Sequence, residues 1–372
     1  MHPYQTFPDR QFWSKSVSKD FDAREVATLP YPLLNAGHKI MSAGSCFAAT
    51  LVPYLEKSGF RYVRTSSKHP NFETAAAENF SYDTFSAAYG NIYTARHLLQ
   101  LTRRSLGTFS PQEDRWHIDG AVIDPFRPGL RYFARTDREF DLLTKQYLDS
   151  VVAAFRSCDV FIFTLGLTEA WRSKLDGAVY PACPGTIAGT FDGTLYEFVN
   201  FTVADVTDDL NAFVEEIRRI NPNVRIILTV SPVPLVATAS RHHVLAATIY
   251  SKSVLRVAAE QTVVKNENVF YFPAYEIVTG PQSPKNFFES DMRSVSSEAI
   301  EVVMAAFLAK CEPSEFVKLK TDTQSPDANE LADLSARLSA LECEEAAALR
   351  QNAPVRSMSS NGSEMLRLTR KS

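Results

Sequence analysis

The chain has 372 residues, of which 45% are apolar and 11% aromatic, and its formal net charge is -4. This composition is typical of a globular protein with one large or two modest domains, and the slight acidity gives no electrostatic case for a nucleic-acid partner. Five widely spaced cysteines without a CxxC pair argue against a disulfide framework and against a structural zinc site. We therefore expect no metal and no other cofactor.

The first residues are polar and aromatic and lack the continuous apolar stretch of a signal peptide. The longest apolar runs, such as 224–230 with Arg225 inside it, are far shorter than the roughly 20 residues of a membrane span. These features predict a cytoplasmic protein with no membrane span.

Prolines interrupt residues 1–37, which we expect to form an irregular lead-in. Next come a short strand at 38–43, a helix at 46–58 and a second strand at 60–64. Residues 65–140 carry mixed signals and are interpreted as a long insertion that contains a helix at 94–104 and small strands or loop pieces at 115–118 and 131–135.

A regular pattern resumes after the insertion. Helical spacing is found at 140–156, 205–220, 244–264 and 296–308, and short apolar strands are predicted at 160–165, 224–230 and 269–272. Strands that alternate with helices of this length predict an α/β fold with a parallel sheet covered on both faces. The catalytic domain would span 38–311, and its ligands would sit at the carboxyl ends of the strands.

The composition changes after Cys311. Residues 312–330 are predicted to be a linker, and 331–350 a single amphipathic helix through which the chain would self-associate. Residues 351–372 are polar and Ser-rich and predict a disordered tail.

Ser45 follows the first strand and precedes the first long helix. A helix N-terminus offers free backbone N–H groups to a developing oxyanion, and small residues before the serine allow the sharp turn that exposes its hydroxyl. The alternative is a helix-capping serine, which is common. Cys46 is a second candidate nucleophile, although its side chain is expected to pack inward.

The run Gly44-Ser45-Cys46-Phe47-Ala48 spells the motif of the GSCFA family, and the chain resembles that family in further segments at 89–94, 164–171, 181–186, 230–234 and 250–253. The family belongs with the SGNH (GDSL-like) hydrolases. The resemblance implies a flavodoxin-like three-layer α/β/α domain and activity toward esters.

The resemblance also implies roles for individual residues. Ser45 would be the nucleophile, and Gly90, with Asn91 beside it, would supply part of the oxyanion hole. Gly166 starts the third block, in which Thr168 stands where the family pattern has Asn and Glu169 where it has Asp. An ordinary helix start is the alternative interpretation of 166–169.

The fifth block departs from the pattern. Asp291 is present, but Ser294 occupies the position of the catalytic histidine, and a hydroxyl cannot accept a proton at neutral pH. His243, or less favourably His242, follows a core strand at the correct sheet edge, so His243 is the predicted general base and Asp291 its partner. The alternative is that this histidine pair caps or packs at the start of the following helix.

Other side chains have alternative roles. Glu169 is an alternative base, because burial can raise the pKa of a carboxyl group. Arg293 would keep Asp291 ionised or bind an anionic part of a substrate. Lys252 and Arg256 lie one helical turn apart; a solvated face is expected for them, and a face turned toward a ligand is the alternative.

These features predict an SGNH-type serine esterase or acyltransferase that acts on a small acyl ester, possibly of a carbohydrate, with the insertion as a lid or substrate wall over Ser45. The alternative is a non-catalytic carbohydrate-binding or scaffold protein that keeps the fold without its histidine.

Overall fold

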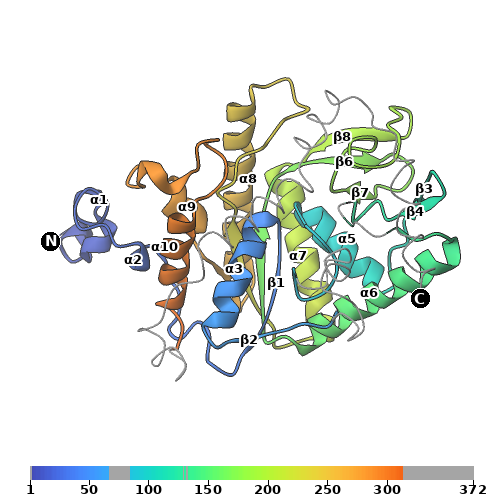
Figure 1. Ribbon diagram of the computed structural model, residues 1–372. Helices are drawn as coiled ribbons and strands as arrows, with labels where there is room; N and C mark the ends of the chain where they lie inside the picture. Colours follow the sequence, from blue (N-terminus) through green and yellow to red (C-terminus); the bar gives the residue numbers. More distant parts are fainter. Residues whose placement is uncertain (1, 67–83, 129, 131–132, 313–372) are drawn as a thin grey trace, which may run out of the picture.

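The computed structural model describes residues 2–66, 84–128, 130 and 133–312. The predicted helix 331–350, the tail 351–372 and nearly all of the linker 312–330 lie outside the described residues. At the centre is a parallel sheet of β1 (Lys39–Ala43), β2 (Arg61–Tyr62), β5 (Val160–Leu165), β9 (Arg225–Val230) and β10 (Val269–Tyr271). The strands lie in the order β10-β9-β5-β1-β2 (Figure 1), which is the flavodoxin-like order.

The sheet is apolar on both faces because its strands alternate their side chains between two cores. In β5, all six residues are buried: Phe161, Phe163 and Leu165 enter one core, and Val160 and Ile162 enter the other. The predicted parallel sheet and its covered faces are therefore confirmed.

Helices cover both faces of this sheet. One layer consists of α5 (Ala95–Ser105), α6 (Asp137–Ser157), α7 (Val203–Ile220) and α8 (Val244–Lys265). The other consists of α2 (Ala23–Val26), α3 (Cys46–Lys57), α9 (Ala274–Thr279) and α10 (Ser297–Leu308). The stretch 65–140 thus contributes loops and also α5 and the start of α6, which belong to one of the two helical layers that cover the sheet.

A second sheet was not predicted. Strands β6 (Glu169–Ser173), β7 (Val179–Tyr180) and β8 (Tyr196–Asn200) form an antiparallel sheet in the order β7-β6-β8. Because β6 begins at Glu169, the interpretation of 166–169 as a helix start is wrong. The aromatic pair Trp171 and Phe198 faces across β6 and β8 in register, and the pair stabilises a sheet too short for a periodicity signal.

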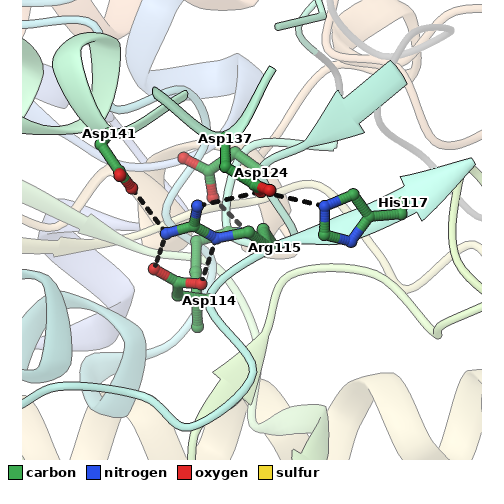
Figure 2. Close-up of polar contacts among 7 residues, drawn as sticks. Asp114, Arg115, His117, Asp124, Asp137 and Asp141 are labelled. Atoms are coloured by element: carbon green, nitrogen blue, oxygen red, sulfur yellow. Dashed lines mark hydrogen bonds and ion pairs between the residues drawn. The ribbon is translucent and has the colours of Figure 1, made fainter. Parts of the chain in front are cut away.

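A small hairpin of β3 (Trp116–Ile118) and β4 (Ala121–Ile123) is fastened to α6 by charges. Figure 2 shows Arg115 among three carboxylates, with Nε and Nη2 on Asp114, Nη1 on Asp137 at 3.1 Å and Nη2 on Asp141 at 2.7 Å. His117 reaches Asp137 at 2.9 Å. These carboxylates already have a cation, so the cluster anchors the hairpin.

The lead-in forms only short pieces, η1 (Pro3–Gln5), η2 (Asp9–Gln11) and α1 (Trp13–Ser16), before α2 packs on α10, and a further short turn, η3 (Lys285–Phe287), precedes α10. Among the described residues, no helix combines the length and apolar character needed to cross a bilayer.

Candidate active site

Ser45 lies in a constrained turn between β1 and α3. Gly44 has φ of 153°, and a Cβ there would lie 2.7 Å from the Ala48 Cβ and 2.9 Å from the Thr164 Cβ. Only glycine fits this backbone and this space without displacement. The turn therefore places Ser45, which is 4% exposed, at the carboxyl edge of the central sheet.

Ser45 occupies the N-cap position of α3, but its side chain accepts no capping hydrogen bond. The N-cap side chains Thr94, Thr136, Thr202 and Ser296 all accept one from the first turn of their helices. The Ser45 hydroxyl makes no hydrogen bond to any described residue. Because the cap is what a structural serine at this position provides, its absence favours a role for the hydroxyl in chemistry over one in capping.

The loop that carries Gly90 and Asn91 packs directly on this turn. The N–H of Ile92 donates to the Gly44 carbonyl at 2.8 Å, Gly90 has φ of 68°, and Asn91 is buried. The Asn91 amide donates to the Tyr93 hydroxyl at 3.3 Å and retains a second N–H. Gly90 and Asn91 therefore lie in a loop that contacts the turn of Ser45.

Gly166 lies beside the same loop, since its N–H and that of Leu167 both donate to the Tyr93 carbonyl at 3.1 Å. Thr168, two residues on, is fully buried, and its hydroxyl donates to the Asn200 side chain at 2.6 Å. Because a hydroxyl has one hydrogen to donate, Thr168 would serve an oxyanion only after giving up this bond. The hydrogen bond between Thr168 and Asn200 links the start of β6 to the end of β8.

Glu169 and Arg293 both line a pocket of about 80 Å³ beyond the strand ends. Burial raises the pKa of the Glu169 carboxyl, while a 2.7 Å hydrogen bond from the Thr238 hydroxyl opposes that rise. Arg293 donates through Nε to the Pro234 carbonyl at 3.3 Å. The remaining wall is largely apolar and aromatic, with Tyr93, Leu167, Ala170, Trp171, Pro181, Phe198, Leu235, Val236, Ala237 and Ala239.

Asp291 is bonded within its own turn. It accepts the N–H groups of Arg293 at 2.9 Å and Ser294 at 2.8 Å, and the Ser294 hydroxyl at 2.6 Å. Burial opposes ionisation, but these hydrogen bonds and the Arg293 charge outweigh it and lower the pKa of the carboxyl. The Asp291 carboxylate is therefore held within its own turn, in part by the Ser294 hydroxyl.

His243 caps α8, and this gives it a structural contact. Its Nδ1 accepts the Leu245 N–H at 3.2 Å, and its side chain is exposed. His242 is exposed as well. Neither imidazole has a hydrogen bond to Ser45 or Asp291 among the described residues, so the predicted pairing of His243 with Ser45 is not formed in this structure.

The middle of α8, in contrast, reaches the site. The Ser251 hydroxyl accepts the Thr168 N–H at 3.0 Å, and Lys252 Nζ donates to the Gly166 carbonyl at 2.6 Å. Lys252 is 2% exposed. Its prediction as a solvated side chain is wrong, because it lies on the buried stripe that includes Thr248, Leu255 and Ala259. That helical spacing was the sequence signal that could have found it.

Arg256 behaves differently. It is partly exposed and pairs with Glu276 and Glu260, each at 2.8 Å. Cys46, the alternative nucleophile, is buried as predicted.

Comparison with known proteins was made at three levels. The model of the GSCFA family matches residues 39–307. Among curated proteins, none matches the chain. A carbohydrate esterase family 3 structure from Talaromyces cellulolyticus has 10% identity and a TM-score of 0.34, covering 77% of this chain and 100% of its own.

Two further solved structures are similar at the same low level. A mutant acetyl esterase with an acetate ion has 9% identity and a TM-score of 0.33, over 72% of this chain and 93% of its own. A carbohydrate esterase family 2 enzyme from Corynascus thermopiles (Myceliophthora fergusii) has 15% identity and a TM-score of 0.30, over 77% of this chain and 68% of its own.

The family match begins at β1 and ends in α10, so it takes in more than two thirds of the 372 residues and every side chain described at the sheet edge. The chain therefore belongs to the GSCFA family.

Proposed function

We propose that the protein is an SGNH-type serine esterase or acyltransferase with Ser45 as its nucleophile. The observation that supports this most is the uncapped Ser45 hydroxyl in a turn that only Gly44 permits. A turn built at steric cost around an uncapped serine is the arrangement that acyl transfer uses.

The surrounding backbone suits the charge that develops during such a reaction. Attack of Ser45 Oγ on an ester carbonyl places negative charge on the carbonyl oxygen, and pre-oriented N–H groups lower the energy of that state. The N–H groups of Ser45 and Gly90 donate to no described residue, and the Asn91 amide has one N–H to spare. These three are the proposed oxyanion donors.

The 80 Å³ pocket supports a carbohydrate or a related small alcohol as the part of the ester that leaves. Its rings, from Tyr93, Trp171 and Phe198, offer apolar faces, and the carboxyl of Glu169 and the guanidinium of Arg293 offer polar contacts from two sides. Ser45 does not line this pocket. The loop at 90–93 connects the two, because Ile92 bonds to Gly44 and Tyr93 bonds to Gly166.

The test is release of 4-nitrophenol from 4-nitrophenyl acetate and of acetate from peracetylated sugars. Wild type is compared with Ser45→Ala and with the matched control Ser296→Ala, which changes another N-cap serine far along the chain. Activity that survives in Ser296→Ala and is lost in Ser45→Ala supports the proposal. Equal background rates in all three proteins, with both substrates, contradict it.

The absence of a fifth-block histidine favours a second candidate, a binding protein that keeps the fold without catalysis. The same pocket would then hold an acylated carbohydrate without reaction. Calorimetric binding of the acetylated sugar to wild type, with no acetate released over hours, would support this second candidate and contradict the first.

A further inference from the structure

Lys252 is a buried cation without a counter-ion. Its side chain is 2% exposed, and its only hydrogen bond to a described residue goes to the uncharged Gly166 carbonyl at 2.6 Å. None of the salt bridges between described residues includes it. An ammonium group deprived of water and of a carboxylate is expensive to keep, so a purely structural lysine is a poor explanation for this position.

Lys252 bonds to the strand end that neighbours the Ser45 turn. Phe163 of β5 is in register with Ala43 of β1, so the residues after the two strands, Gly166 and Ser45, emerge at neighbouring points of the same edge. Among the described residues, the titratable groups whose charges act on Lys252 are Cys46, the residue after Ser45, and Arg293 from the loop before α10. Because Cys46 directly follows Ser45 in the chain, Lys252 lies within electrostatic range of the Ser45 turn.

His243 is far from this place. It lies nine residues before Lys252 on the same helix, which corresponds to about 13 Å along the helix axis. Figure 1 shows the first turns of α8 rising beyond the ends of the central strands.

We propose that Lys252 is the proton acceptor for Ser45, in a serine–lysine pair that replaces the missing histidine. This inference rests on the proposed function. Ser45 Oγ forms a bond to the acyl carbon while its proton moves to the neutral Nζ. The bond from the acyl carbon to the alcohol oxygen then breaks, and that oxygen takes the proton from Nζ. Water, or an acceptor alcohol, then attacks the acyl carbon while its proton moves to Nζ. The bond from the acyl carbon to Ser45 Oγ breaks, and Oγ takes that proton from Nζ.

The Lys252 amine can accept a proton from Ser45 near neutral pH. Burial, with a smaller contribution from the Arg293 charge, lowers the pKa of Lys252 to about 7, while Cys46 opposes the shift. A base with such a pKa is half neutral at pH 7. The hydrogen bond from Nζ to Gly166 orients the side chain in the ligand-free protein, and catalytic contacts commonly tighten only when substrate is bound.

The experiment measures kcat/KM for 4-nitrophenyl acetate from pH 5 to 9.5, together with the rate at which a fluorophosphonate probe labels Ser45, followed by intact mass. The variants are Ser45→Ala, Lys252→Met, Lys252→Gln, Lys252→Arg, His243→Ala and the exposed control Lys265→Met from the last turn of α8. Thermal unfolding confirms that each variant is folded, and the two neutral substitutions provide separate chances of a folded protein.

We expect both neutral variants to lose at least 100-fold in kcat/KM and in labelling rate, which is the lower range for a general base. Lys252→Arg should not restore activity, because a guanidinium does not release its proton. Wild type should show an acidic limb near pH 7 that Lys265→Met retains. If Lys252 were only structural, the residual activity of Lys252→Met and Lys252→Gln would still show this acidic limb.

Two results overturn the assignment while the proposed function survives: neutral Lys252 variants within threefold of wild type, or loss of activity in His243→Ala alone. If wild type neither hydrolyses the ester nor takes up the probe beyond the level of Ser45→Ala, the proposed function fails, and the role of Lys252 fails with it.

Discussion

The burial of Lys252 makes a prediction about stability that does not depend on any substrate. In Lys252→Met, an apolar chain of similar length replaces the ammonium. The pKa of Lys252 falls from 10.5 to about 7 on folding. At about 1.36 kcal/mol per pKa unit, this shift corresponds to a destabilisation on the order of 5 kcal/mol when the group is charged.

The sign follows from proton linkage. Between the two pKa values the unfolded chain binds more protons than the folded one, so the stability of wild type rises with pH. The penalty is complete well below pH 7 and disappears above about pH 10.5. It is about 5 kcal/mol at pH 6 and roughly 1–2 kcal/mol at pH 9.5. Methionine has no such dependence, but it leaves the Gly166 carbonyl without its donor, which costs about 1–3 kcal/mol at either pH.

Lys252→Met should therefore be more stable than wild type by about 2–4 kcal/mol at pH 6, and this advantage should shrink by about 3 kcal/mol at pH 9.5. Urea unfolding followed by tryptophan fluorescence at the two pH values measures the difference, with Lys265→Met as the exposed control. A difference between Lys252→Met and wild type that does not change with pH would refute the reasoning, because the lysine would then not be a desolvated cation.

Three further outcomes are expected. Ser45→Ala should lower kcat/KM at least about 10³-fold yet change the free energy of unfolding by less than about 0.5 kcal/mol. Ser296→Ala removes a capping hydrogen bond and should lower the free energy of unfolding by about 1 kcal/mol. Urea unfolding and the esterase assay check both variants, and equal losses of stability would mean that Ser45 caps α3. Gly44→Ala should destabilise the protein by about 1–3 kcal/mol and abolish activity, because the new Cβ would contact Ala48 and Thr164. Gly177 also has a positive φ but open space around it, so Gly177→Ala should lower stability less. A similar melting temperature for the two variants would contradict the steric reason. Ser294→His should raise ester hydrolysis at least about 10-fold, since Asp291 already bonds position 294; an unchanged rate in the folded variant would show that this turn does not face Ser45.

Much of the fold follows from local patterns in the sequence. The apolar run 160–165 is a strand buried on both faces, and the helical stripe of 205–220 is α7 with a capping box at Thr202 and Asp205. Such elements are predictable because periodicity and caps act within a few residues. Ser45 was found for the same reason, since a strand, two small residues and a helix are adjacent in the chain.

The short strands β6, β7 and β8 escaped prediction, because each is only two to five residues long and is stabilised by pairing with segments up to about 30 residues away. Pairing of this kind leaves no periodic signal.

What surrounds Ser45 was decided by tertiary structure alone. The sequence by itself placed a serine after the first strand, an aspartate without its histidine, and glycines near the other strand ends. The packed protein decided for the alternative in which His243 caps α8, and it alone turned Lys252 inward to the Gly166 carbonyl. The physical reason is that the burial of a charged side chain depends on which helix face meets the sheet, and residues far apart in the chain, such as Lys252 and Gly166 at a separation of 86 positions, determine that contact.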